Sequence, residues 1–186
     1  MVDKGAPRVL VSTFLKTSAD GDRLSLEPYR VAFQMAAASQ GASAEAVAVV
    51  AEGRRRQDEL AAKVLQHIIG ELEKAGRRPI VAALLVNRSG WIIDLLKYSL
   101  AFAEHVPVAE GLAVREALRF AFRRCGIDAA ELDEKSLPGV AAETLGLSTT
   151  EIDSHLKRLG ATAGKPWRKE QKLACLAAWV TIVGRR

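Results

Sequence analysis

The stretch Pro138-Gly-Val-Ala-Ala-Glu-Thr-Leu-Gly-Leu-Ser-Thr-Thr-Glu-Ile-Asp-Ser-His-Leu-Lys157 predicts two short helices joined by a tight turn. Ala141 and Leu145 are four residues apart, so they share one face of the first helix, beside Ala142. Gly146 follows at the point where the chain must reverse, because glycine adopts a left-handed conformation without a Cβ clash. Leu147 then closes the turn by packing inward.

The second helix of this stretch has a clear start and two distinct faces. Ser148 and Glu151 form a capping box, which satisfies two otherwise unpaired amide groups. Ile152 and Leu156 share a buried face at four-residue spacing. The opposite face presents Thr149, Thr150, Asp153, Ser154 and Lys157. Small residues at the contact and a polar outer face are typical of a helix-turn-helix, whose second helix reads base edges in the major groove.

A second interpretation of the same residues stays open. A glycine turn between two capped helices also describes a tight helical hairpin that only builds a core. The two interpretations differ in what the outer face contacts, which is DNA in one case and water in the other.

Leu145-Gly-Leu-Ser-Thr-Thr-Glu-Ile-Asp-Ser-His-Leu156 resembles the recognition half of the LuxR-type helix-turn-helix family, and the resemblance extends weakly over residues 137–183. It implies a C-terminal DNA-binding domain whose last helix serves packing and dimer contact. Arg115-Glu116 resembles the Arg-Glu pair that opens that domain, at a longer interval. Residues 1–110 resemble no receiver or autoinducer domain.

Charge is unevenly distributed around the motif. From His155 to Arg186 there are eight lysines and arginines against the single Glu170, whereas seven acids face only Lys135 between Gly126 and Asp153. Cations in the first turns of the predicted last helix oppose its dipole, so contact with phosphate would explain why they are placed there. The candidate DNA-binding residues are Thr149, Thr150, Asp153, Ser154, Lys157, Arg158, Lys165, Arg168, Lys169 and Lys172.

Two further groups of arginines could contact either phosphate or water. One is the triplet Arg54 to Arg56 on a predicted long helix, residues 44–74. The other follows one face of the predicted helix 114–124 and comprises Arg115, Arg119, Arg123 and Arg124.

The composition is that of a globular protein. The 186 residues are 49% hydrophobic and carry a net charge of +5, enough for one substantial domain or two small ones. Residues 1–15 show no secretory leader, and the longest apolar run, residues 80–86, is far shorter than the roughly 20 residues of a membrane span. We therefore expect a cytoplasmic protein.

Cysteine and histidine usage predicts no metal and no cofactor. Cys125 and Cys175 lie in apolar helical patterns, which favours buried free thiols over a disulfide framework. His67, His105 and His155 are far apart in the sequence and have no ligand spacing.

The remaining patterns predict a mainly α fold, a multi-helix bundle with the C-terminal helix-turn-helix and a short N-terminal β-hairpin or arm. Residues 8–15 give the main β signal, and residues 23–26 follow turn chemistry as a second strand. The pattern of residues 79–87 predicts a helix or a buried segment. That of residues 91–104 predicts the most hydrophobic helix of the chain. We expect a helical dimerisation or partner-sensing region over residues 1–110 and a DNA-binding region over 111–186.

The function predicted from these features is a DNA-binding transcriptional regulator that acts as a dimer on double-stranded DNA, with a protein partner for the N-terminal helices left open. The alternative is a helical adaptor or regulatory subunit without DNA binding. An enzyme is disfavoured because the chain has no phosphate loop, nucleophile elbow or metal spacing. We name no catalytic residue.

Overall fold

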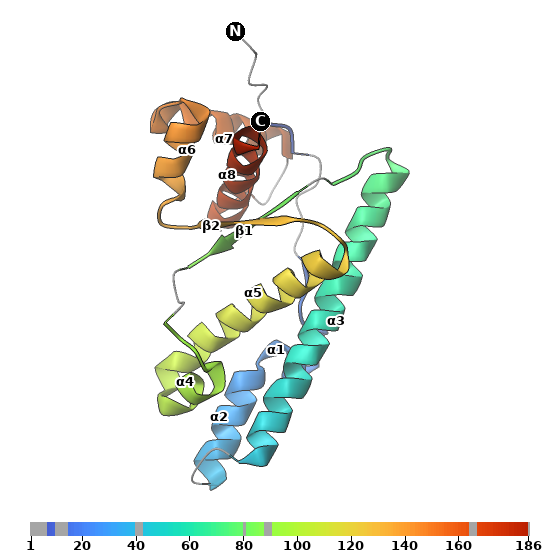
Figure 1. Cartoon of the computed structure of the whole chain (residues 1–186), viewed down its shortest axis with the longest axis vertical. Helices are drawn as coiled ribbons and strands as arrows, with labels where there is room; N and C mark the ends of the chain where they lie inside the picture. The colour runs from blue at the N-terminus through green and yellow to red at the C-terminus, as the bar shows by residue number, and fades with distance from the viewer. Residues whose placement is uncertain are drawn as a thin grey trace. The chain divides into compact units, whose positions relative to one another are not determined.

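The computed structural model is mainly helical, as predicted, and describes residues 7–9, 15–39, 43–79, 81–87, 91–163 and 167–185 (Figure 1). None of the helices in these ranges combines the length and apolar character that a membrane span requires. The elements are α1 (Arg23–Leu26), α2 (Pro28–Ser39), α3 (Ala44–Lys74), β1 (Ala82–Val86), α4 (Leu95–Ala101), the 3-10 helix η1 (Ala103–His105), α5 (Val106–Arg124), β2 (Ala129–Asp133), α6 (Leu137–Leu145), α7 (Thr149–Ala163) and α8 (Lys169–Gly184).

The chain forms two compact units that each combine distant segments. Residues 15–79 and 89–127 make one, here called the helical unit, and residues 1–14, 80–88 and 128–186 make the other, the C-terminal unit. The division expected at residues 110 and 111 instead falls inside α5. Strand pairing explains why each unit combines distant segments. β1 lies between α3 and α4 in the sequence, but it pairs with β2, which follows α5.

The helical unit is built on close contact between α3 and α5, with α1, α2 and α4 packed beside them (Figure 1). Ala113, Ala117 and Ala121 recur at every fourth position of α5 and are almost completely buried. Such small side chains let two helix backbones approach closely. Gly53 lets α3 continue past α1 and α2, because a Cβ there would collide with the Leu24 carbonyl and with Pro28.

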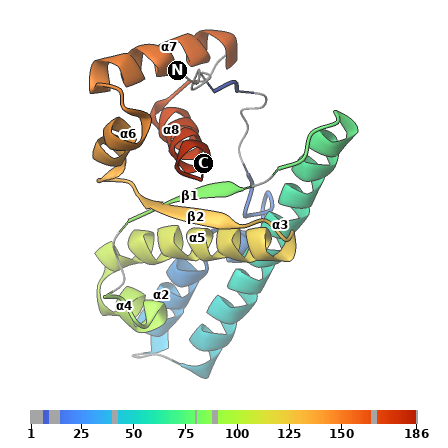
Figure 2. The same cartoon turned by 45° about the horizontal axis from the view of Figure 1, so that its top comes forward.

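The C-terminal unit combines three helices with a two-stranded parallel sheet, on which α8 packs. β1 pairs with β2 from Ala82 opposite Ala129 to Val86 opposite Asp133, and α8 packs on β1 and on α6 (Figure 2). One buried cluster joins α6, α7 and α8. Its members are Leu137, Ala141, Leu145, Ile152, Leu156, Leu159, Leu176, Ala177, Trp179 and Val180.

The N-terminal hairpin prediction fails at its second strand. Residues 23–26 form helix α1, because the Asp22 carboxylate accepts hydrogen bonds from the amides of Leu24 and Ser25 and so starts a helix. Of the first strand, residues 10–14 lie outside the described residues.

Two other segments differ from their predicted form. Residues 82–86, read as a helix or buried segment, form strand β1. Only Leu95–Ala101 of the predicted helix 91–104 is α-helical, because Asp94 caps α4 by accepting the Lys97 amide at 3.0 Å. Trp91 and Ile93 therefore lie outside the helix and are exposed.

Candidate nucleic-acid interface

The turn between α6 and α7 has the conformation that its sequence predicts. Gly146 ends α6 in the left-handed region at φ 62°. The amides of Gly146 and Leu147 both donate to the Ala142 carbonyl, at 3.0 and 3.3 Å, which closes the end of α6. Leu147 packs against the core of the unit, as expected.

The predicted capping box starts α7. The Glu151 carboxylate accepts the Ser148 amide at 2.8 Å and the Ser148 hydroxyl at 2.7 Å, and the Ser148 oxygen accepts the Glu151 amide at 3.3 Å. Hydrogen bonds from Ser148 lower the pKa of Glu151 below its usual value. The start of α7 is thus fixed by its own residues.

The two faces of α7 divide as the spacing predicts. Ile152, Leu156 and Leu159 are buried in the core of the C-terminal unit. The exposed side chains include six of the candidate residues, Thr149, Thr150, Asp153, Ser154, Lys157 and Arg158.

A groove brings candidate residues of α7 and α8 together. It has a volume of about 290 Å³. Thr149 and Asp153 border it from α7, and Lys169 and Lys172 border it from α8. Its apolar lining comes from Pro138, Ile152, Leu156, Leu173 and Leu176. Two lysines and one carboxylate therefore share one concave surface, which the sequence did not place together.

Some of the candidate side chains have partners within the unit. Arg158 lies 2.8 Å from Nδ1 of His155, and the Ser154 hydroxyl donates to the Thr150 carbonyl at 2.8 Å. Lys169 lies 3.5 Å from Glu134. Arg168 is exposed at the start of α8 and Lys172 is half-buried, whereas Lys165 lies outside the described residues.

The acids before the motif have structural partners. Asp133 accepts the amides of Lys135 and Ser136 at 3.1 and 3.0 Å and so shapes the turn that leads into α6. Asp128 lies 3.7 Å from Arg185, and Glu134 pairs with Lys169. These acids serve turns and ion pairs in the C-terminal unit.

Two aromatic contacts, neither of which the sequence pattern predicted, involve α7 and α8. The indole of Trp167 lies directly over Gly160, so close that a methyl group at position 160 would collide with it. The His155 ring meets the Trp179 ring edge-on at a centroid separation of 5.4 Å. A glycine inside a helical pattern was the available signal for the first contact.

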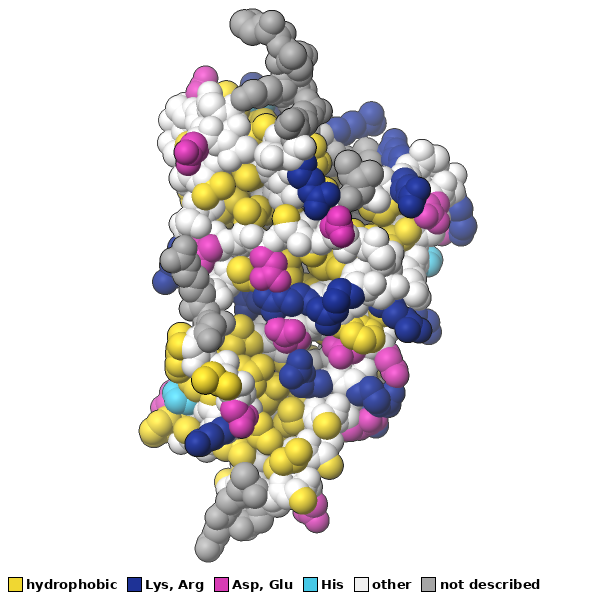
Figure 3. Space-filling model, viewed as in Figure 1, with side chains coloured by type: hydrophobic (Ala, Val, Ile, Leu, Met, Phe, Trp, Pro, Cys, Tyr) yellow, Lys and Arg dark blue, Asp and Glu magenta, His cyan; other side chains and the backbone are white. Residues whose placement is uncertain are grey.

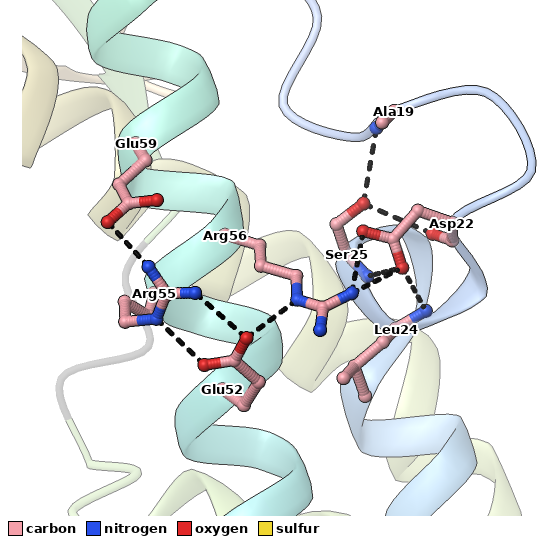
Figure 4. A network of polar contacts seen from close by, with 8 residues as sticks. All are labelled: Ala19, Asp22, Leu24, Ser25, Glu52, Arg55, Arg56 and Glu59. Carbon is pink, nitrogen blue, oxygen red and sulfur yellow. Dashed lines mark hydrogen bonds and ion pairs between the residues drawn. The ribbon is translucent and has the colours of Figure 1, made fainter.

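Two arginines of the triplet on α3, Arg55 and Arg56, form ion pairs within the helical unit (Figure 4). Arg55 lies between Glu52 and Glu59 at 2.7 and 2.6 Å, and Arg56 contacts Glu52 at 2.8 Å and Asp22 at 3.2 Å. Hydrogen bonds from Arg55 and Arg56 lower the pKa of Glu52 to about 2. This arrangement favours a solvated, salt-bridged surface over a phosphate contact.

Metal-binding geometry is missing from the described part of the chain, where no three histidine, cysteine, aspartate or glutamate side chains could hold an ion together. Comparison with known family models, curated protein sequences and solved structures gives no match to this chain.

Proposed function

We propose that this protein is a DNA-binding transcriptional regulator, acting as a dimer, in which α7 enters the major groove of double-stranded DNA. The observation that carries the proposal is that α7 has one buried face and one exposed polar face. Its buried face anchors it to α6 and α8, while a continuous polar face of short side chains is exposed behind a capped start. Recognition helices need this combination of firm anchoring and short polar groups.

The chemistry of the outer face fits base and phosphate contacts. Thr149 and Thr150 lie at the start of α7, the part of a recognition helix that meets base edges. Asp153 is an acceptor suited to the amino group of cytosine. Lys157 lies one turn further along and offers a cation for phosphate.

The first turns of α8 supply additional positive charge beside α7. Arg168 is exposed, and Lys172 lines the groove that also contains Thr149 and Asp153. A phosphate at this groove would offset the unfavourable position of these cations at a helix start. Lys169 forms an exposed ion pair with Glu134, and it would leave this pair to bind the phosphate.

The proposal is tested by measuring duplex DNA affinity for Lys157→Ala and Arg168→Ala. Each substitution should weaken binding about tenfold near 0.1 M salt, because each removes one phosphate contact. The matched control is Lys63→Ala, an exposed lysine on α3, which should bind as the wild type does. Unchanged affinity for both variants would place the interface elsewhere. A protein that ignores DNA and co-elutes with another protein would instead fit an adaptor.

A further inference from the structure

Large apolar side chains project into solvent on either side of α4. Trp91 is 70% exposed, Ile93 98% and Phe102 62%, all within the helical unit. Hydrophobic side chains gather over α2 and α4 on this face (Figure 3). Single exposed apolar residues are common, but a contiguous group of this kind marks an interaction surface.

An apolar pocket lies beside these side chains. Its volume is about 840 Å³. The lining is mostly apolar and comes from α2, α3 and α4, namely Phe33, Ala36, Ala37, Val47, Leu96, Leu100 and Ala101. Asp94 and Lys97 also line the pocket. A projecting Ile93 therefore immediately precedes a residue that lines a concave apolar site.

We propose that this face binds a second copy of the chain through a two-fold axis, so that Ile93 of each copy enters the pocket of the other. An isologous contact requires one surface to carry both a projection and a matching hollow. The pocket lining carries one acid and one base, Asp94 and Lys97, so a two-fold contact allows Asp94 of one copy to pair with Lys97 of the other. The proposal deepens the proposed function, since it rests on the dimer assumed there and names its face.

The exposed groups favour a second copy over a small ligand. A small molecule inside the pocket would leave Trp91, Ile93 and Phe102 in water. A two-fold contact covers these side chains on both copies, and each aromatic side chain can bury roughly 150–250 Å². With Ile93 and the apolar lining of the pocket added, each copy contributes a substantial part of the roughly 800 Å² per partner in a stable interface.

Sedimentation velocity without DNA tests this face. The wild type should sediment as a dimer, and Ile93→Arg should raise the dimer dissociation constant about thirtyfold or more, as expected for a central contact. The matched control is Leu26→Arg, a leucine on α1 that is 60% exposed and lies outside the pocket lining. It should remain dimeric. Circular dichroism should show unchanged helix content in both variants.

Lys97→Glu gives a second measurement, because it sets two acids against each other across the axis. It should weaken the dimer, whereas Lys63→Glu should not. A monomeric wild type, or an Ile93→Arg protein that dimerises normally, would overturn the inference, and so would a monomer that takes an apolar dye into the pocket. Because the assay contains no DNA, an Ile93-dependent dimer that ignores DNA would refute only the proposed function. A protein that binds DNA as a dimer and keeps that dimer in Ile93→Arg would refute only this face.

Discussion

Glu110 on α5 joins two helices of the helical unit through one oxygen. Its Oε1 accepts the amides of Tyr29 and Arg30 at the start of α2, at 2.8 and 3.0 Å. Its Oε2 is buried with no hydrogen-bond partner among the described residues. Burial raises the pKa of Glu110 to about 7, although the two amides act in the opposite direction.

This raised pKa predicts a pH-dependent stability. Between the usual pKa of 4.5 and about 7, the folded state keeps the Glu110 proton that the unfolded state loses. Stability should therefore fall as pH rises through this window. Glu110→Gln keeps an acceptor oxygen without charge, so its stability relative to the wild type should improve progressively from pH 4.5 to 7. Urea unfolding at several pH values measures this, and a constant difference between the proteins would contradict it.

Gly160 predicts a packing effect at a single residue. Alanine there would collide with the Trp167 indole, so Gly160→Ala should destabilise the protein by about 1–3 kcal/mol despite its better helix propensity. Gly139→Ala on α6 is the matched control, because a Cβ at that position meets nothing within 4 Å. The control should be neutral or stabilised by up to about 1 kcal/mol. Equal stability of the two variants in urea would refute the contact.

At the scale of the element, different residues determine the stability of α7 and its proposed DNA contacts. Ser148→Ala should cost about 1 kcal/mol, because it removes the oxygen that caps the helix. Ser154→Ala, in the exposed middle of α7, should leave stability unchanged or slightly raised. In the proposed function it should still weaken DNA binding. Thermal unfolding and DNA titration of both variants measure the two effects independently, and a Ser154→Ala protein that loses stability would contradict this division.

Local signals predicted the helices better than the strands. The turn at Gly146 and the start of α7 follow from residues within five positions of each other, so the sequence carries them completely. β1 and β2 have alanine-rich sequences with little β-branched character, and they pair across α4 and α5. Such non-local pairing leaves no periodic signal within either strand.

The sequence predicted the part of the candidate interface that lies on α7, but not the part that α8 adds. The exposed face of α7 follows from its buried residues. The groove that adds Lys169 and Lys172 depends on how α8 packs against α7, and the pairing of Lys169 with Glu134 depends on the turn after β2. Contacts of this kind arise from tertiary packing, which spacing along the chain does not encode.

At the scale of the whole molecule, the proposed two-fold dimer predicts the form of the proposed DNA site. Two copies of α7 should lie about one helical turn apart, roughly 34 Å, and read a pseudo-palindrome. Footprinting should then protect two half-sites of related sequence. Shifting the spacing between half-sites by half a turn should abolish tight binding, and equal affinity for both spacings would contradict a dimeric reader.

The central claim is that the outer face of α7 reads DNA, and selection from a random duplex library at two salt concentrations tests it most directly. The wild type should enrich a defined sequence whose binding falls steeply as salt rises, because the contacts include several phosphates. The double variant Lys157→Ala with Arg168→Ala should enrich the same sequence far more weakly. Absence of enrichment by the wild type at low salt would contradict the claim.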